Sequence, residues 1–339
     1  MGPAGTTPKG DMMKNRVVDR VWNRSSRILL PVVAAILVAG GGRAAENTPR
    51  QEPPQHQGTE ARDAGGERFD GYLFLDANGN PLPVQSDAAI EDLLREGVVV
   101  SMKKIPVGIS APQKTLLASG TLQFNAVFKT IDEEKKNVRD TTAGKKNFYL
   151  VWRDSYVYDI AAYHVDRLFG FDRVPPVVFR KIKRRQGSLG IWLEGTITEK
   201  GRREQGIDPP ELARFNQQKA TLSLFDNLVA NRDSNLGNAL IDGNWRLWFI
   251  DCSRCFGTSK DLLYPEAITH CDRAVWKTLQ AVDRETADHD LSPYLSGAEI
   301  DALLARRDKL VEHVQDLIAQ YGEGLVLFDQ RPPTERAPW

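Results

Sequence analysis

The sequence Asn231–Phe256, NRDSNLGNALIDGNWRLWFIDCSRCF, carries more information on the fold than any other part of this 339-residue chain. It places Asp233 five residues before Asn238, and Asp251 stands thirteen residues further on. The run Trp245–Ile250, which is largely apolar, ends directly before Asp251. Two carboxylates and an amide at this spacing are typical of the loop and hairpin of a phosphoryl-transfer site.

A short β-hairpin is predicted inside this stretch. Segments 239–241 and 247–250 form its strands, joined by an Asp-Gly-Asn turn. The antiparallel return would bring Asn238 and Asp251 side by side, as two oxygen ligands for Mg²⁺, with phosphate oxygens and water completing the octahedron. Asp233 would then face the hydroxyl group that accepts a phosphoryl group. The alternative is an Asx-rich turn followed by an ordinary hairpin.

Two further charged residues upstream fit the same chemistry. Lys129 ends the apolar strand Phe124–Thr130 in the sequence Ala-Val-Phe-Lys, from which an ammonium group can reach the α- and β-phosphates of a nucleotide. Asp159 lies among apolar and small residues of a predicted helix and would hold that ammonium group in place. Asp154 and Asp166 are alternative partners. A solvent-facing lysine at a strand edge is the alternative for Lys129.

Weaker signals come from a loop and a basic turn. Gly108 and Ser110, between the first two predicted strands, could let backbone amides approach phosphates, although an ordinary β-turn explains them equally well. A basic run on a predicted hairpin indicates a solvated turn or, less often, a surface for an acidic or phosphorylated partner. The run comprises Arg180, Lys181, Lys183, Arg184 and Arg185.

The order of predicted elements gives an α+β fold with two lobes. The first half is rich in strands and has one long helix after them, and the second half is mostly helical apart from the hairpin. The crevice between such lobes is a natural ligand site. The predicted strands are Val98–Met102, Lys114–Ala118, Phe124–Thr130, Val174–Ile182 and Leu189–Leu193, and the predicted helices are Ala88–Glu96, Tyr156–Phe169, Pro210–Val229, Arg273–Asp283 and Gly297–Tyr321.

Composition excludes several classes of protein. Lys+Arg and Asp+Glu balance at 45 each, which argues against a nucleic-acid-binding protein. The chain has no G-x-S-x-G or H-E-x-x-H motif, and its five histidines are scattered, so hydrolases and metalloproteases are disfavoured. Three cysteines cannot build a disulfide framework, and although Cys252 and Cys255 are spaced like half a zinc site, a second pair is missing, which disfavours zinc. Outside the cytosol, Cys271 could pair with Cys252 or Cys255.

The N-terminal part predicts export. Residues 1–45 are interpreted as a signal peptide or short membrane anchor, because the apolar run 28–40 follows a basic leader and is short for a membrane span. Residues 46–68 predict a disordered linker. The body, 69–330, would divide into lobes near residue 195. It would be periplasmic, secreted or tethered facing outward, with possible membrane proximity, and cytoplasmic only if translation starts elsewhere.

From about Val98 to Ile318 the chain resembles a known family. The segment 158–176, YDIAAYHVDRLFGFDRVPP, and the segment 231–238, NRDSNLGN, are similar to those of atypical kinases grouped with phosphatidylinositol 3- and 4-kinases. The small bacterial members and the secretory-pathway kinases related to Golgi casein kinase are most similar. The resemblance implies a two-lobed protein-kinase-like fold, ATP with Mg²⁺ or Mn²⁺ as cofactors, and a protein, glycan or lipid hydroxyl as acceptor.

The resemblance also implies a role for each site residue. Lys129 would bind phosphates with Asp159 as its acidic partner, Asp233 would be catalytic, Asn238 and Asp251 would hold the metal, and Glu194 would lie in the hinge beside adenine. The family usually has glutamate where Asp159 stands, and Ser234 and Cys252 also depart from its pattern. A catalytically inactive kinase-like nucleotide-binding or scaffold protein of the cell envelope is therefore the alternative.

Overall fold

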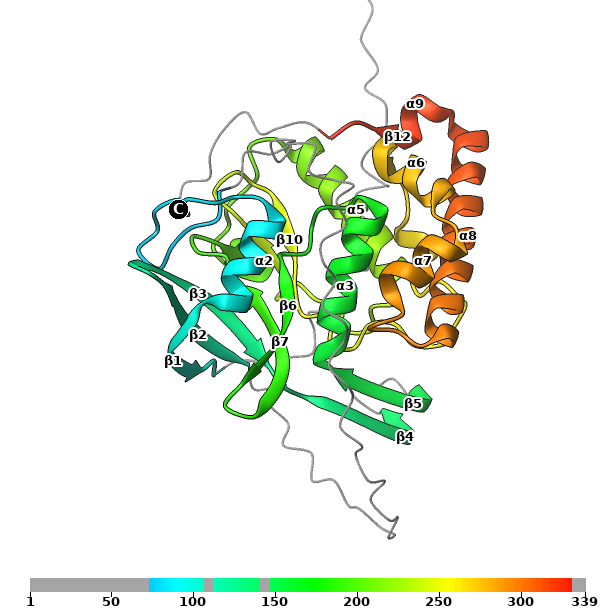
Figure 1. The fold of residues 1–339 in the computed structure, drawn as a ribbon. Helices are drawn as coiled ribbons and strands as arrows, with labels where there is room; N and C mark the ends of the chain where they lie inside the picture. Colours follow the sequence, from blue (N-terminus) through cyan, green and yellow to red (C-terminus); the bar gives the residue numbers. More distant parts are fainter. Residues whose placement is uncertain (1–72, 107–111, 141–146, 331–339) are drawn as a thin grey trace, which may run out of the picture.

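A five-stranded antiparallel sheet forms the body of the N-terminal lobe (Figure 1). The computed structural model describes residues 73–106, 112–140 and 147–330. Along the central strand, Phe124, Ala126 and Phe128 alternate with less buried residues, so that one face of the sheet carries the core. In spatial order the strands are β1 (Val98–Lys104), β2 (Gln113–Ser119), β3 (Leu122–Lys129), β7 (Arg185–Ile191) and β6 (Val177–Ile182).

Two helices pack beside this sheet. Helix α2 (Asp87–Glu96) begins at Ser86, whose side chain accepts a hydrogen bond from a first-turn amide, and it buries Ile90 and Leu94 against the sheet. Helix α3 (Tyr156–Phe169) ends at Gly170, which adopts a left-handed conformation at φ 72°. Figure 1 shows α3 between the sheet and the helices of the second lobe. Its buried residues belong to the core of that second lobe.

A two-stranded ribbon leads into α3 and was not predicted. Strands β4 (Asp132–Asp140) and β5 (Asn147–Ser155) pair antiparallel, with Asp132 opposite Ser155. The sequence of β4, DEEKKNVRD, lacks the apolar alternation that identifies a half-buried strand. Its pairing therefore depends on its partner strand and not on a pattern of its own.

The C-terminal lobe is mostly helical, as predicted. The predicted helices correspond to α5 (Leu212–Leu228), α6 (Arg273–Ala281) and α8 (Gly297–Tyr321). The short helices α4 (Glu199–Glu204), α7 (Arg284–Leu291) and α9 (Glu323–Val326) were not predicted. None of the helices in the described ranges is long and apolar enough to cross a membrane. The lobe contains β8 (Ile197–Thr198), α4 (Glu199–Glu204), α5 (Leu212–Leu228), β9 (Ala239–Ile241), β10 (Leu247–Phe249), the 3₁₀ turn η2 (Pro265–Ala267), β11 (Cys271–Asp272), α6 (Arg273–Ala281), α7 (Arg284–Leu291), α8 (Gly297–Tyr321), α9 (Glu323–Val326) and β12 (Leu327–Phe328).

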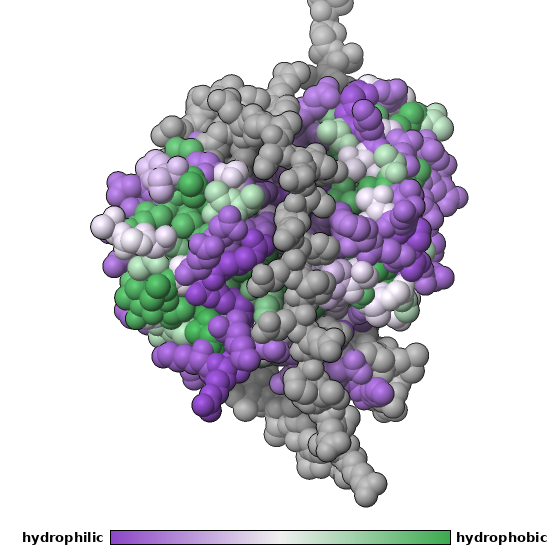
Figure 2. All heavy atoms as spheres, viewed as in Figure 1, coloured by the Kyte–Doolittle hydropathy of each residue, from purple (hydrophilic) through white to green (hydrophobic). Residues whose placement is uncertain are grey.

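Each lobe has its own hydrophobic core, and Trp248 of the helical lobe belongs to the core of the sheet lobe. Trp248 on β10 is fully buried, and its ring centroid lies 6.3 Å from that of Phe74 in the sheet lobe. The α+β arrangement of a β-rich lobe followed by a helical lobe confirms the predicted fold class. In Figure 2, hydrophilic residues dominate the face of the helical lobe on the right. Val98 and Val100 of the edge strand β1 are exposed.

Candidate active site

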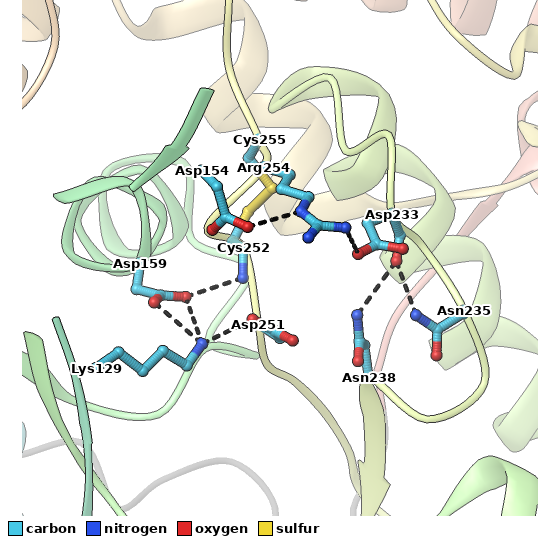
Figure 3. A network of polar contacts seen from close by, with 10 residues as sticks. All are labelled: Lys129, Asp154, Asp159, Asp233, Asn235, Asn238, Asp251, Cys252, Arg254 and Cys255. Atoms are coloured by element: carbon cyan, nitrogen blue, oxygen red, sulfur yellow. Dashed lines mark hydrogen bonds and ion pairs between the residues drawn. A yellow bond between two sulfur atoms is a disulfide. The ribbon is translucent and has the colours of Figure 1, made fainter. Parts of the chain in front are cut away.

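Three charged side chains from three separate elements meet between the lobes (Figure 3). The Nζ atom of Lys129, at the end of β3, lies 3.0 Å from the carboxylate of Asp159 on α3. The same Nζ atom lies 2.8 Å from Oδ1 of Asp251, which follows β10. The backbone amide of Cys252 donates a second hydrogen bond to Asp159, at 2.9 Å. Residues far apart in the sequence are thus gathered around one ammonium group.

Burial and neighbouring charges shift the pKa values of the three groups in this cluster. The positive charge of Lys129 lowers the pKa of Asp251 below its usual range. Burial raises the pKa of Asp159, and the Lys129 charge opposes that rise. Burial would lower the pKa of Lys129, but the two carboxylates more than offset it and raise that pKa. The ammonium group therefore stays charged at neutral pH.

The β9–β10 hairpin brings Asn238 and Asp251 to the same end, as the sequence predicted. Phe249 pairs with Ala239, and the amide of Ile250 donates to the carbonyl of Asn238 at 3.0 Å. Asp251 itself adopts a left-handed backbone conformation at φ 64°, which aspartate tolerates better than most residues. The amide of Asn238 and the carboxylate of Asp251, whose side chain is 33% exposed, are oxygen donors of the kind that Mg²⁺ and Mn²⁺ prefer.

The loop that follows α5 holds Asp233 through a network of hydrogen bonds. The Asp233 amide donates to Asn231 Oδ1 at 3.0 Å, and the side-chain amides of Asn235 and Asn238 donate to the Asp233 carbonyl at 2.9 and 3.2 Å. Asp226 on α5 anchors this loop, since it accepts from Asn231 Nδ2 at 2.8 Å. Burial raises the pKa of Asp226 to about 7.

Asp226 also accepts a hydrogen bond from Ser234 Oγ, at 2.5 Å. The backbone of the loop is therefore tied to the helix before it and to the hairpin after it. The carboxylate of Asp233, whose side chain is 45% exposed, points toward Arg254 (Figure 3).

Two members of the site were missed by sequence reasoning. Arg254 donates from Nε to Asp154 at 2.9 Å and from Nη1 to Asp233 at 3.0 Å. The sequence suggests Asp154 only as an alternative partner of Lys129. No local pattern connects Asp154, Asp233 and Arg254, which lie up to 100 residues apart. The position of Arg254, three residues after a candidate metal ligand, was the only signal in the sequence.

The cysteines correct one expectation. Cys252 and Cys255 form a disulfide with each other, with their Cα atoms 5.2 Å apart. Cys271 is a free, buried cysteine on β11, so the pairing of Cys271 with either of the others was wrong. A tight turn explains the observed pairing, because the amide of Cys255 donates to the carbonyl of Cys252 at 3.0 Å.

The remaining predicted site residues fall elsewhere. Glu194, after β7, accepts hydrogen bonds from Lys114 Nζ at 3.2 Å and from Asn125 Nδ2 at 2.7 Å. Gly108 and Ser110 lie outside the described residues. On the basic β6–β7 hairpin, Arg180 donates to the carbonyls of Leu94 and Gly97, whereas its other basic residues are exposed: Lys181, Lys183, Arg184 and Arg185.

Comparison with known proteins finds one matching family model and several similar solved structures. Residues 79–187 match the family model described as Fam20C, Golgi casein kinase, C-terminal, Fam20. The structure of hydra Fam20 with sugar superposes with a TM-score of 0.53 at 16% identity, covering 73% of this chain and 94% of that one. The chain has a protein-kinase-like fold. This confirms the fold predicted from the sequence.

Two structures of the Golgi casein kinase are also similar. One superposes with a TM-score of 0.53 at 14% identity, covering 74% of this chain and 81% of that one. The other, which has Mn/ADP bound, gives a TM-score of 0.50 at 14% identity, covering 73% and 80%. No curated protein matches the chain. The likeness to phosphatidylinositol kinases stays a prediction. The family match includes Lys129 and Asp159 but ends before Asp233, Asn238 and Asp251.

Proposed function

We propose that this protein is a kinase that transfers the γ-phosphate of ATP to a hydroxyl group of its acceptor. The observation that carries the proposal is the convergence of Lys129, Asp159 and Asp251 from β3, α3 and the end of β10, with Asp233 and Asn238 opposite them. The match of the sheet lobe to a Golgi casein kinase family model supports it, as does the similar structure with Mn/ADP bound.

Lys129 is the residue that binds the α- and β-phosphates in this proposal. Its ammonium group is held by Asp159, so it is positioned before nucleotide arrives and little conformational entropy is lost on binding. Asp251 and Asn238 would hold Mg²⁺ or Mn²⁺, which supplies positive charge to the β- and γ-phosphate oxygens. Glu194, Gly108 and Ser110 are proposed to contact the nucleotide on the adenine and phosphate sides.

Asp233 is the residue that handles the acceptor. One carboxylate oxygen is fixed by Arg254, and the other can accept the hydrogen bond of an incoming hydroxyl group. As the hydroxyl oxygen bonds to the γ-phosphorus, its proton passes to Asp233 and the β–γ bridging oxygen leaves with ADP. Partial burial raises the pKa of Asp233 and the charge of Arg254 opposes that rise, which leaves a carboxylate able to act as a base.

The acceptor is proposed to be a protein, glycan or lipid outside the cytosol. The Cys252–Cys255 disulfide supports an oxidising compartment, where such bonds persist. The predicted signal segment, residues 1–45, lies outside the described residues. Labelling of envelope or secretory-compartment extracts would identify the acceptor.

The direct test is incubation of the full chain with [γ-³²P]ATP and Mg²⁺ or Mn²⁺, with and without such an extract. Transfer of label to the protein itself or to a component of the extract supports the proposal. Lys129→Met should remove the transfer, whereas Lys181→Met, a matched change of an exposed lysine on β6, should not. Nucleotide-dependent stabilisation without any transfer under these conditions would instead support the inactive kinase-like alternative.

A further inference from the structure

Arg254 joins two carboxylates that belong to different parts of the site. Its Nε atom donates to Asp154, at the end of β5, and its Nη1 atom donates to Asp233 in the loop after α5. Figure 3 shows the guanidinium group lying between the two acids. An arginine with fixed partners on both sides can transmit the position of one carboxylate to the other.

The side of Arg254 that faces Asp154 is the anchored side. The Asp154 side chain is only 4% exposed, and the Arg254 guanidinium also lies over the Trp152 ring, 5.4 Å from its centroid. Exposed ion pairs hold their partners weakly, but a buried carboxylate and an aromatic ring fix the plane of a guanidinium group. Asp233, which is 45% exposed, is the less buried partner, so Arg254 is the group that can fix its orientation.

The backbone around Arg254 is fixed as well. The buried Cys252–Cys255 disulfide closes the turn that carries it. Before the turn, the Cys252 amide donates to Asp159, and within it the carbonyl of Ser253 accepts from the amide of Ser155 at 2.9 Å. This short segment is thus attached to α3 and to the end of β5, which also carries Asp154.

We propose that Arg254 is a positioning residue that holds the Asp233 carboxylate in line for the acceptor hydroxyl, and that the Cys252–Cys255 disulfide holds Arg254 in place. The inference rests on the proposed function. With one oxygen of Asp233 bonded to Nη1, rotation of the carboxylate stops and its other oxygen is directed to the acceptor. In this proposal the nucleotide phosphates bind Lys129 and the metal held by Asn238 and Asp251, not Arg254 or Asp154, so the effect of Arg254 should fall on the chemical step.

The test compares Arg254→Met and Arg254→Lys with the full-length wild type. Arg254→Met should lower kcat about 10- to 100-fold, the range expected when a catalytic group loses its alignment, and should leave KM for ATP within about twofold. Arg254→Lys should recover part of kcat, because an ammonium group can contact Asp233 without forming the full bridge. A change in KM for ATP with kcat unchanged would overturn the inference.

Two further variants test the anchors. As a single variant, Asp154→Asn should lower kcat. Combined with Arg254→Met it should cause little further loss, since both changes remove the same bridge. Cys252→Ser combined with Cys255→Ser should also lower kcat at constant KM for ATP, whereas Cys271→Ala, the control at the free cysteine, should not. Strictly additive losses, or a double serine variant with the wild-type kcat, would contradict the proposed anchoring.

A readout that needs no activity separates this inference from the proposed function. Amide hydrogen exchange in residues 231–238 should be faster in Arg254→Met than in the wild type, while exchange in α8 stays the same. Unchanged exchange in 231–238 would overturn the inference even in an active enzyme. Faster exchange in a protein that binds no nucleotide and transfers no phosphate would support the Arg254 contact and refute the kinase proposal.

Discussion

Replacing Lys129 by methionine should destabilise the fold because it leaves the buried carboxylate of Asp159 without its positively charged partner. Lys129 and Asp159 are 12% and 9% exposed, and their charged groups lie 3.0 Å apart. Removing one partner of such a pair costs about 3–5 kcal/mol in the free energy of unfolding. Asp251, which is 33% exposed, keeps access to solvent and contributes less. For a domain of this size, each kcal/mol shifts the Tm by about 2–4 °C, so we expect a fall of about 6–20 °C.

The pH dependence of this loss follows from Asp159. Burial already raises the pKa of Asp159, and without Lys129 the folded-state pKa rises further above the unfolded value. A raised carboxyl pKa contributes its stability at low pH and loses it as pH rises through the folded pKa. The deficit of Lys129→Met relative to the wild type should therefore be smaller at pH 5 than at pH 7.5.

A double variant checks the cause. Adding Asp159→Asn to Lys129→Met removes the stranded charge and should restore part of the lost stability, as measured by urea denaturation of the full chain. The reasoning is refuted if Lys129→Met costs less than about 1 kcal/mol, well below the range for a broken buried pair. It is also refuted if Asp159→Asn destabilises the Lys129→Met protein further.

Three other predictions concern the loop and the sheet. Burial raises the pKa of Asp226 to about 7, so this group should make the folded state less stable as pH rises from 4 to 7, and Asp226→Asn should flatten that part of the Tm–pH curve. Asp233→Asn should lower kcat at least about 100-fold while the shift in Tm on adding ATP is retained. Gly187→Ala should destabilise the fold by about 1–3 kcal/mol and weaken ATP binding, because the added Cβ would collide with the Lys129 carbonyl and the Phe128 ring. If this variant and the wild type have the same Tm, the contact between β3 and β7 is not tight enough to exclude a methyl group.

Elements with clear end signals were predictable from the sequence. Helix α3 matches its predicted bounds because Ser155 and Gly170 mark its ends, and α8 matches because Ser296 and Gly322 do so. The β9–β10 hairpin was predictable from its Asp-Gly-Asn turn, and with it the adjacency of Asn238 and Asp251. In each case the decisive interactions join residues that are close in the sequence, so a short sequence pattern is enough to predict them.

Contacts between distant segments were not predictable in the same way. Asp154 binds Arg254 and not Lys129, which depends on how β5 and the segment after β10 pack. Three cysteines allow three pairings, and the observed one depends on the turn that brings Cys252 and Cys255 together, while Cys271 lies elsewhere in the helical lobe as a free cysteine. Strand β4 is stabilised by its partner, so its charged sequence gave no indication of it.

The central claim is most directly tested by single-turnover transfer from [γ-³²P]ATP with the wild type, Asp251→Ala and the control Asp316→Ala, an exposed aspartate on α8. We expect the wild type and Asp316→Ala to transfer label at the same rate. Asp251→Ala should be folded by its melting curve and should transfer none, because the group that holds the divalent cation on the phosphates is gone. A folded Asp251→Ala protein that transfers label at the wild-type rate would contradict the account.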